Sequence, residues 1–244
     1  MINQKNEARY KNYYHYIQEE WSSQPKQSFL RLLHMVEQDK LPNNSHCLDI
    51  GCATGELIHF LSNHYSNFHF TGVDIFDALL DKAKNVLPKH TFLNQSVLNF
   101  PLEMTEKFDL ITAVGVMSIF DEKELVTFWE NILSAAKPGG KIYIFSPLNE
   151  YGVDLITIHR KRINARVGSW EKGWNIYSLE TMHDILSSYS CAFAFEKFEV
   201  TLDLPRREDP VRTWTMTTAS RSRQLTNGLK LLIDHYFIKV TKLG

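Results

Sequence analysis

The order of apolar and polar positions along the chain predicts alternating strands and helices. Short apolar runs of the kind that form buried strands occupy residues 47–50, 68–73, 91–94, 109–114 and 141–145. Between these runs apolar residues recur at helical spacing, for example at Leu57, Ile58 and Leu61. Five such alternations within about 100 residues indicate an α/β domain with a mostly parallel sheet.

Local signals mark where several helices begin and end. Asp121 and Glu124 have the spacing of a capping box, and Pro138-Gly139-Gly140 ends the helix that follows them. Asp77 and Ser178 are candidate N-caps of two further helices, because short polar side chains accept hydrogen bonds from the first free N–H groups.

The two ends of the chain follow different patterns from the middle. Residues 1–41 begin with several tyrosines and continue at helical period, so they are interpreted as an N-terminal helical arm or lid. Residues 42–244 are interpreted as the main domain. Within it, residues 147–177 show no clean period and are interpreted as an insertion. Seven strands are expected in all, the last two at about residues 192–204 and 236–240.

Composition narrows the class of protein. The chain has 244 residues, of which 43% are hydrophobic and 23% charged, which is typical of globular proteins. A net charge of −1 gives no whole-chain attraction to nucleic acid or an acidic membrane. Cys47, Cys52 and Cys191 form no CxxC pair, which argues against a disulfide framework and for a reducing compartment. No apolar run resembles a signal peptide or reaches the ~18 residues of a membrane span, so we expect a soluble, cytoplasmic protein without membrane partners.

A glycine-containing segment, residues 48–56, joins the first predicted strand to a helix. Ligands of open parallel sheets bind beyond the carboxyl ends of the strands, where such a turn lies. Gly51 and Gly55 let the backbone approach a ligand closely, and Asp49 can reach an ammonium or hydroxyl group. A dinucleotide site would need a third glycine at Glu56, whose charge would repel phosphates. A nicotinamide dehydrogenase is therefore disfavoured.

A second acidic residue supports a cationic ligand without phosphates. Asp74 ends the next predicted strand, 19 residues after Gly55. A carboxylate at this place can accept hydrogen bonds from both hydroxyls of a ribose. S-adenosylmethionine combines a ribose with an ammonium and a sulfonium, and it fits this pair of acids.

These motifs resemble those of the class I S-adenosylmethionine-dependent methyltransferases. The segments LDIGCATGEL, GVDI, NQSVLNFPL and FDLITAVGVMSIF resemble the family's first four motifs, and AKPGG resembles the turn after its next helix. The resemblance covers about residues 45–146 well and the C-terminal third loosely. It implies a seven-stranded, mostly parallel Rossmann-like sheet with helices on both faces and an antiparallel last strand. It also implies S-adenosylmethionine as cofactor and S-adenosylhomocysteine as product.

The resemblance further implies which residues hold the cofactor. They are Asp49, Gly51, Cys52, Ala53, Gly55, Asp74, Ile75, Ser96, Val97, Val114 and Gly115. By this resemblance Asp49 orders the methionine end, Asp74 holds the ribose and Ile75 lies against the adenine. Ser96 stands where the family usually has a carboxylate for the adenine amino group, so that contact comes either from its hydroxyl or from the Val97 backbone. Ala53 replaces the family's middle glycine.

Methyl transfer requires few catalytic residues that could be recognised in a sequence. The leaving group departs neutral, so no general acid is needed, and catalysis is largely orientation. A base is needed only where the acceptor atom carries a proton; a carboxylate needs none. No metal-ligand spacing such as H-x-x-x-H is present, so no metal is expected.

The acceptor side is expected from the arm and from residues 147–177. Tyr13 and Tyr14 either form a lid or pack on the core. Arg160, Arg162 and Trp174 belong to a basic, aromatic stretch with three interpretations: binding of an anionic acceptor, binding of RNA, or an ordinary solvated surface. His159 in the same stretch is the candidate base, with a plain surface histidine as the alternative.

The sequence thus predicts a methyltransferase that acts on a small molecule, with a carboxylate or other oxygen acceptor favoured. The alternatives are a tRNA or rRNA methyltransferase that uses the basic stretch, and a non-catalytic protein that retains the cofactor-binding fold. Nucleic acid is the weaker partner because the chain is nearly neutral. A monomer or a homodimer is expected.

Overall fold

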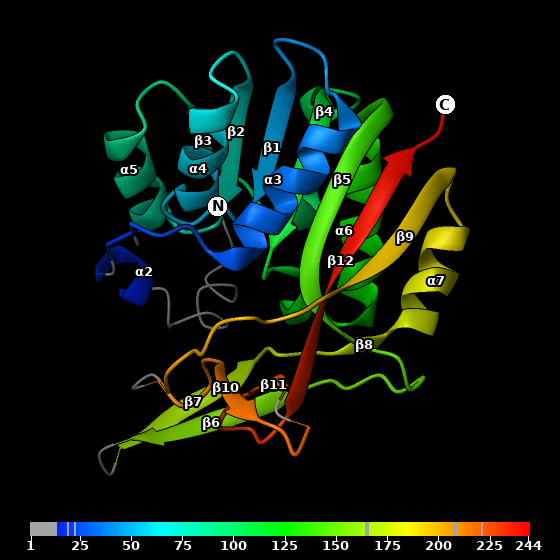
Figure 1. Ribbon diagram of the computed structural model, residues 1–244. Helices are drawn as coiled ribbons and strands as arrows, with labels where there is room; N and C mark the ends of the chain where they lie inside the picture. The colour runs from blue at the N-terminus through cyan, green and yellow to red at the C-terminus, as the bar shows by residue number, and fades with distance from the viewer. Residues whose placement is uncertain (1–13, 19, 22, 164–165, 207–208, 221) are drawn as a thin grey trace.

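The computed structural model describes residues 14–18, 20–21, 23–163, 166–206, 209–220 and 222–244. Its centre is a ten-stranded sheet in which eight strands lie in the order β10-β11-β12-β5-β4-β1-β2-β3, while β8 pairs with β5 and β9 with β12 (Figure 1). The strands are β1 (His46–Ile50), β2 (His69–Asp74), β3 (Thr91–Asn94), β4 (Phe108–Val114), β5 (Ala136–Asn149), β8 (Tyr177–Ser178), β9 (Cys191–Phe198), β10 (Trp214–Thr217), β11 (Arg223–Thr226) and β12 (Leu232–Lys242). A separate hairpin consists of β6 (Ile158–Ile163) and β7 (Arg166–Lys172).

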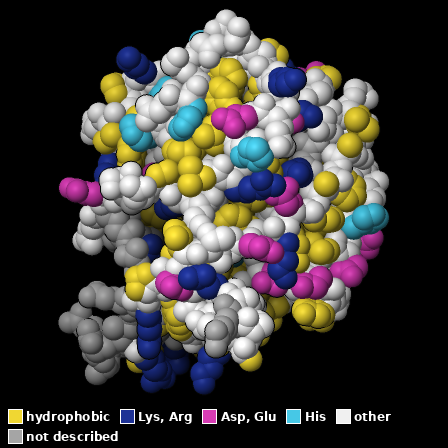
Figure 2. All heavy atoms as spheres, in the orientation of Figure 1, with side chains coloured by type: hydrophobic (Ala, Val, Ile, Leu, Met, Phe, Trp, Pro, Cys, Tyr) yellow, Lys and Arg dark blue, Asp and Glu magenta, His cyan; other side chains and the backbone are white. Residues whose placement is uncertain are grey.

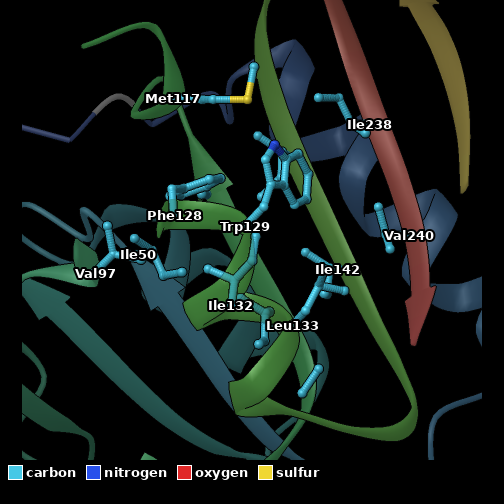
Figure 3. Packing of buried hydrophobic residues seen from close by; sticks show 14 of the residues in the cluster. Ile50, Val97, Met117, Phe128, Trp129, Ile132, Leu133, Ile142, Ile238 and Val240 are labelled. Atoms are coloured by element: carbon cyan, nitrogen blue, oxygen red, sulfur yellow. The ribbon is translucent and has the colours of Figure 1, made fainter. Parts of the chain in front are cut away.

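Helices cover both faces of the sheet. They are α2 (Tyr14–Gln18), α3 (Gln27–Asp39), α4 (Glu56–His64), α5 (Asp77–Val86), α6 (Glu122–Ala135) and α7 (Leu179–Ser187), with short 3₁₀ turns η1 (Val97–Asn99), η2 (Leu102–Met104) and η3 (Met117–Ile119). One apolar core lies under α3, α4 and α5, and a second lies under α6 and α7. We call these two sides of the sheet the α3 face and the α6 face. On the α6 face, Phe128, Trp129 and Ile132 of α6 point into the packed interior (Figure 3).

The parallel and antiparallel parts of the sheet meet at β5. Strands β3, β2, β1, β4 and β5 are parallel, which confirms the predicted α/β class. The last strand, β12, is antiparallel to both β5 and β9, as the resemblance implied. The carboxyl ends of the parallel strands therefore meet at one edge of the sheet, which we call the carboxyl edge. In Figure 1 this edge points down, toward the β6–β7 hairpin.

The helix signals are confirmed at two of three N-termini. Asp121 accepts from the Glu124 N–H and the Glu124 side chain accepts from the Asp121 N–H, which completes the capping box. Ser178 caps α7 through the Thr181 N–H. The prediction for Asp77 is wrong, because Asp77 is the first residue of α5 and follows the N-cap Phe76.

The described residues contain twelve strands, more than the seven predicted. The five additional strands are β6, β7, β8, β10 and β11. They are either very short or expose both polar and apolar side chains, so their sequences show no clear alternation of apolar and polar residues. β9 ends at Phe198, before the predicted limit, and β12 begins at Leu232, earlier than predicted. The irregular stretch at 147–177 is built around the β6–β7 hairpin.

Candidate cofactor and acceptor site

The first acidic residue, Asp49, is buried at the end of β1. It lies opposite Thr112 of β4, whose hydroxyl donates to the Asp49 carboxylate over 2.7 Å. Burial raises the pKa of Asp49 to about 7; the Thr112 hydrogen bond opposes this shift, and the negative charge of Asp74 adds to it. In the described part of the chain, no Lys, Arg or His side chain forms an ion pair with Asp49. A ligand cation beside this carboxylate would therefore find a buried partner.

The second acidic residue, Asp74, holds the glycine loop, which we define as residues 51–55. Its carboxylate accepts from the N–H groups of Ala53 at 3.0 Å, Ile75 at 2.7 Å and Phe76 at 3.2 Å. The pKa of Asp74 is raised because burial disfavours the charged carboxylate, and the three backbone hydrogen bonds only partly oppose this shift. Because β1 and β2 are adjacent and parallel, Asp49 and Asp74 lie at the same edge of the sheet, on either side of the loop.

The glycine loop needs unusual backbone angles. Gly51 has φ +65°, Ala53 φ +48° and Gly55 φ +85°, all in the left-handed region. The N–H groups of Gly51 and Cys52 donate to the Val73 carbonyl at 2.8 and 3.1 Å, so the loop is tied to β2. Cys52 is buried, and burial raises the pKa of its thiol. The thiol is therefore protonated and packs as a small apolar group.

Two of the loop glycines contact protein rather than empty space. A Cβ on Gly51 would lie 2.4 Å from Val116 Cγ2. A Cβ on Gly55 would lie 3.0 Å from Leu87 and 3.3 Å from Phe92. A side chain at Gly51 would therefore overlap Val116 rather than enter empty ligand space.

The predicted adenine contacts come from residues that also have structural partners. Ser96 caps η1 by accepting from the Leu98 N–H at 3.2 Å. Val97 is buried, and its carbonyl accepts from Asn131 Nδ2 at 2.8 Å. Ile75 is half-buried directly after Asp74. The hydroxyl proton of Ser96 and the side chain of Ile75 are the parts that a ligand can still use.

The turn that follows β4 leaves open space beside the proposed site. Val114 is half-buried and Gly115 is exposed, with φ +74° and no atom within 4 Å of the place that a Cβ would occupy. The Gly115 N–H donates to the Phe145 carbonyl at 2.9 Å, which fixes this turn to β5. The predicted cofactor residues thus come together at the carboxyl edge of β1, β2 and β4.

The arm reaches the glycine loop through a residue that the sequence did not single out. Trp21 Nε1 donates to the Thr54 hydroxyl at 3.0 Å, and its ring lies 4.9 Å from that of His59. Lys26 forms an ion pair with Glu56, so the charge that disfavoured phosphates is partly compensated. A tryptophan shortly before an apolar helix was the available signal. Tyr13 lies outside the described residues, and the side chain of Tyr14, the first residue of α2, is not described.

The β6–β7 hairpin carries the predicted acceptor residues. Arg160 and Arg162 are exposed, and the Arg160 guanidinium lies 4.8 Å from the centre of the Trp170 ring. Trp174, half-buried at φ +64°, accepts from the Thr157 hydroxyl through its carbonyl. Figure 2 shows Lys and Arg side chains gathered at the lower end of the molecule, where Figure 1 places the hairpin.

His159 lies on the other side of the hairpin from Arg160. Both of its ring nitrogens are buried without a hydrogen bond, and Nε2 is 3.9 Å from a Glu171 oxygen. Burial lowers the pKa of His159. Its neighbours are Lys161, Glu171 and Asp209, so its described contacts run toward the segment before β10 rather than to the glycine loop.

Three further features of the described residues bear on the site. A cavity of about 300 Å³ lies between α3 and strands β5, β9 and β12, beside Asp39 and Lys141 and away from the glycine loop. The described residues contain no cluster of three or more His, Cys, Asp or Glu side chains that could hold a metal. Across the same residues, we find no helix of the length and apolarity that crossing a membrane would require.

Comparison with known proteins finds a match for the segment that holds the glycine loop. Residues 48–142 match a family model described as a methyltransferase domain. This segment is thus similar to a methyltransferase domain. It contains the glycine loop, both acids and the turn after β4, and the match confirms the resemblance seen in the motifs.

Two relatives of this segment have names that describe the methylation of small molecules. The chain is 30% identical over 145 residues to a ubiquinone biosynthesis O-methyltransferase of Coxiella burnetii, covering 54% of this chain and 58% of the relative. It is 23% identical over 166 residues to a trans-aconitate 2-methyltransferase of Escherichia coli, covering 65% of this chain and 61% of the relative. The chain thus spans somewhat over half the length of these relatives.

A solved structure shows the same fold. An S-adenosylmethionine-dependent methyltransferase from Clostridium acetobutylicum superposes with a TM-score of 0.60 at 15% identity, covering 96% of this chain and 99% of that one. At this identity the match establishes the Rossmann-like methyltransferase fold of the whole described chain.

Proposed function

We propose that this protein transfers a methyl group from S-adenosylmethionine to an oxygen atom of a small molecule. The observation that carries the proposal is a pair of carboxylates, the buried Asp49 and the half-buried Asp74, on adjacent strands beside a loop of left-handed backbone. The match of residues 48–142 to a methyltransferase domain supports it, as do the names of the two relatives.

The residues present fit S-adenosylmethionine. Asp49 is a buried carboxylate with a raised pKa, and the positive groups of the ligand would stabilise its ionised form. Three backbone donors fix the Asp74 carboxylate, and its Oδ2 keeps a lone pair for a ribose hydroxyl. The exposed Gly115 leaves the approach free of a side chain, while Gly51 and Gly55 allow the left-handed backbone of the loop. Cys52, Ala53, Ile75, Ser96, Val97 and Val114 complete the proposed cofactor site.

In this proposal the protein acts by orienting the cofactor and the acceptor, and it supplies no general acid. When bound, S-adenosylmethionine supplies an electrophilic methyl carbon whose leaving group is neutral. The glycine loop and Asp74 hold the ribose end, and Asp49 orients the methionine end. The acceptor oxygen then needs alignment with the methyl carbon, which an enclosed site provides by restricting the motion of both partners.

We assign the acceptor side to the arm and to residues 147–177. Trp21 already anchors the arm to the glycine loop, and the insertion is tied to the carboxyl edge because Asn175 donates to the Phe120 carbonyl at 2.7 Å. Tyr13, Tyr14, Arg160, Arg162 and Trp174 are the proposed acceptor residues. In this proposal the two segments close over a compact acceptor and exclude water.

Calorimetry with the purified chain tests the proposal. Micromolar binding of S-adenosylmethionine or S-adenosylhomocysteine is expected, equivalent to about −8 kcal/mol. Asp74→Ala should weaken this binding at least tenfold, since a hydrogen bond to a charged group contributes about 1.5–3 kcal/mol. Asp81→Ala, which removes an exposed carboxylate of α5, is the matched control and should bind normally.

Two results would contradict the proposal. One is tight binding of NADH without binding of S-adenosylmethionine. The other is methylation of tRNA, followed by mass spectrometry, in place of any small molecule.

A further inference from the structure

Four aromatic rings form a patch beside the proposed methyl-transfer site. The ring of Phe145 lies 4.9 Å from His235, 5.1 Å from Phe198 and 4.7 Å from Phe237, centre to centre. We call these four residues the aromatic patch. The carbonyl of Phe145 is the group that accepts from the Gly115 N–H. The patch therefore adjoins the open turn at the end of β4.

The strand register places His235 at the carboxyl edge. His235 of β12 pairs with Pro147 of β5 and with Phe198 of β9. Phe237, two residues further along β12, pairs with Phe145 and belongs to the core of the α3 face. Because side chains alternate along a strand, His235 lies on the α3 face as well, one step closer to the edge.

One polar atom of the His235 ring, Nδ1, has no hydrogen-bond partner in the described residues. This nitrogen is buried, while the ring stacks on Phe145 at an interplanar angle of 12°. A buried ring nitrogen without a partner costs free energy, and phenylalanine would fill the same place without that cost. A histidine here is better explained by a ligand than by packing.

The environment keeps this imidazole neutral. Burial lowers the pKa of His235 to about 4, and the neighbouring Asp234 opposes that shift. Asp234 accepts hydrogen bonds from Lys197 of β9 and from Gln224 of β11. Glu196 of β9 forms ion pairs with Arg31 and Lys239. At neutral pH the ring thus has an unprotonated nitrogen that can accept a proton.

We propose that His235 is the general base for a hydroxyl acceptor, such as a phenol or enol, in the reaction proposed above. As the acceptor O–H bond breaks, its proton goes to the unprotonated ring nitrogen of His235. The oxygen lone pair forms the new bond to the methyl carbon, and the methyl–sulfur pair stays on sulfur. The imidazolium then releases its proton to solvent. A carboxylate acceptor would not need this residue, so the acceptor class is narrowed to hydroxyl compounds.

The first test does not depend on turnover. His235→Phe keeps a ring in the aromatic patch and removes the unpaired nitrogen, so the melting temperature should stay equal or rise. In the S-adenosylhomocysteine-loaded protein, catechol should shift the ¹³C–¹H NMR signals of the His235 ring. His90→Gln is the matched control, because His90 also has a lowered pKa but lies at the opposite edge, just before β3.

The second test separates the base from the cofactor site. His235→Gln should bind S-adenosylmethionine within about twofold of the natural chain, while methylation of catechol should fall ~100-fold or more. A lower melting temperature for His235→Phe, or catechol leaving the His235 signals unmoved, would overturn the role of His235. Equal turnover by His235→Gln would do the same. Failure of the natural chain to bind S-adenosylmethionine would instead overturn the proposed function.

Discussion

The glycine loop and the β6–β7 hairpin lie at the same edge of the sheet but are built in opposite ways. Three N–H groups of the loop are bound by β2, that of Ala53 by the Asp74 carboxylate and those of Gly51 and Cys52 by the Val73 carbonyl, so the polar atoms hold one another in place without a ligand. On the hairpin, Ile158 is 56% exposed and Trp170 is 60% exposed, although the Arg160 guanidinium lies over the Trp170 ring. Under the proposed function, the internally bonded loop is the rigid half, for the cofactor, and the exposed hairpin is the adaptable half, for the particular acceptor.

The largest expected effect on stability comes from a substitution in the glycine loop that contacts no ligand. Gly51→Ala would combine left-handed strain of about 1–2 kcal/mol with overpacking of about 1–3 kcal/mol against Val116. We expect a loss of about 2–5 kcal/mol in the free energy of unfolding, measured by urea denaturation.

Gly115→Ala is the matched control, because Gly115 has a similar φ but nothing near its Cβ position. It should lose only the strain, about 1–2 kcal/mol. Val116→Ala added to Gly51→Ala should restore part of the stability. Equal losses for the two single variants would mean that contact with Val116 does not shape the loop.

The contact between the arm and the loop has a smaller expected effect. Trp21→Phe keeps the ring beside His59 but removes the donor to the buried Thr54 hydroxyl, so stability should fall by about 1 kcal/mol. Trp170→Phe on the exposed hairpin should change stability by less than about 0.5 kcal/mol. Thermal melting of the two variants checks this, and the reverse order would show that the arm does not brace the loop.

The hairpin itself should show the smallest effect on stability. Arg160→Ala/Arg162→Ala should change it by less than about 0.5 kcal/mol, since both side chains are exposed. We also expect no measurable binding of bulk tRNA at ~0.15 M salt, because the chain is nearly neutral. Micromolar tRNA binding that the double substitution weakens, and that Lys84→Ala/Lys89→Ala does not, would assign the hairpin to RNA.

The rigid half could be predicted from the sequence because its signals are local. Asp49, Gly51, Gly55 and Asp74 follow strand ends that a short apolar run already marks, and β3 and the Asp121 capping box lie where the pattern placed them. The role of Asp74 as the acceptor for the Ala53 N–H of the loop was not predictable, since it depends on the angles of the folded loop.

The acceptor half depends on contacts between distant residues. His235 meets Phe145 only because β12 lies beside β5 in one particular register, and nothing near position 235 marks it. Trp21 meets Thr54 across 33 residues of sequence. The hairpin strands carry charged residues on both faces, so their alternation could not be distinguished from a loop.

The measurement that tests the central claim most directly is the pH dependence of S-adenosylmethionine binding. The pKa of Asp49 is raised in the folded chain to about 7, so its contribution to stability is complete below its unfolded pKa and is lost as the pH rises through about 7. Above that pH the ionised carboxylate destabilises the ligand-free fold by up to about 4 kcal/mol, which Asp49→Asn should relieve. A bound cation favours the ionised form, so binding near pH 6 should release close to one proton.

Calorimetry in buffers of different ionisation enthalpy counts that proton. We expect release near pH 6 that disappears by pH 8.5, with affinity rising across the same range, and neither effect in Asp49→Asn. An affinity independent of pH, or the same proton count in Asp49→Asn as in the natural chain, would contradict the assignment of Asp49 to the cofactor's cationic end.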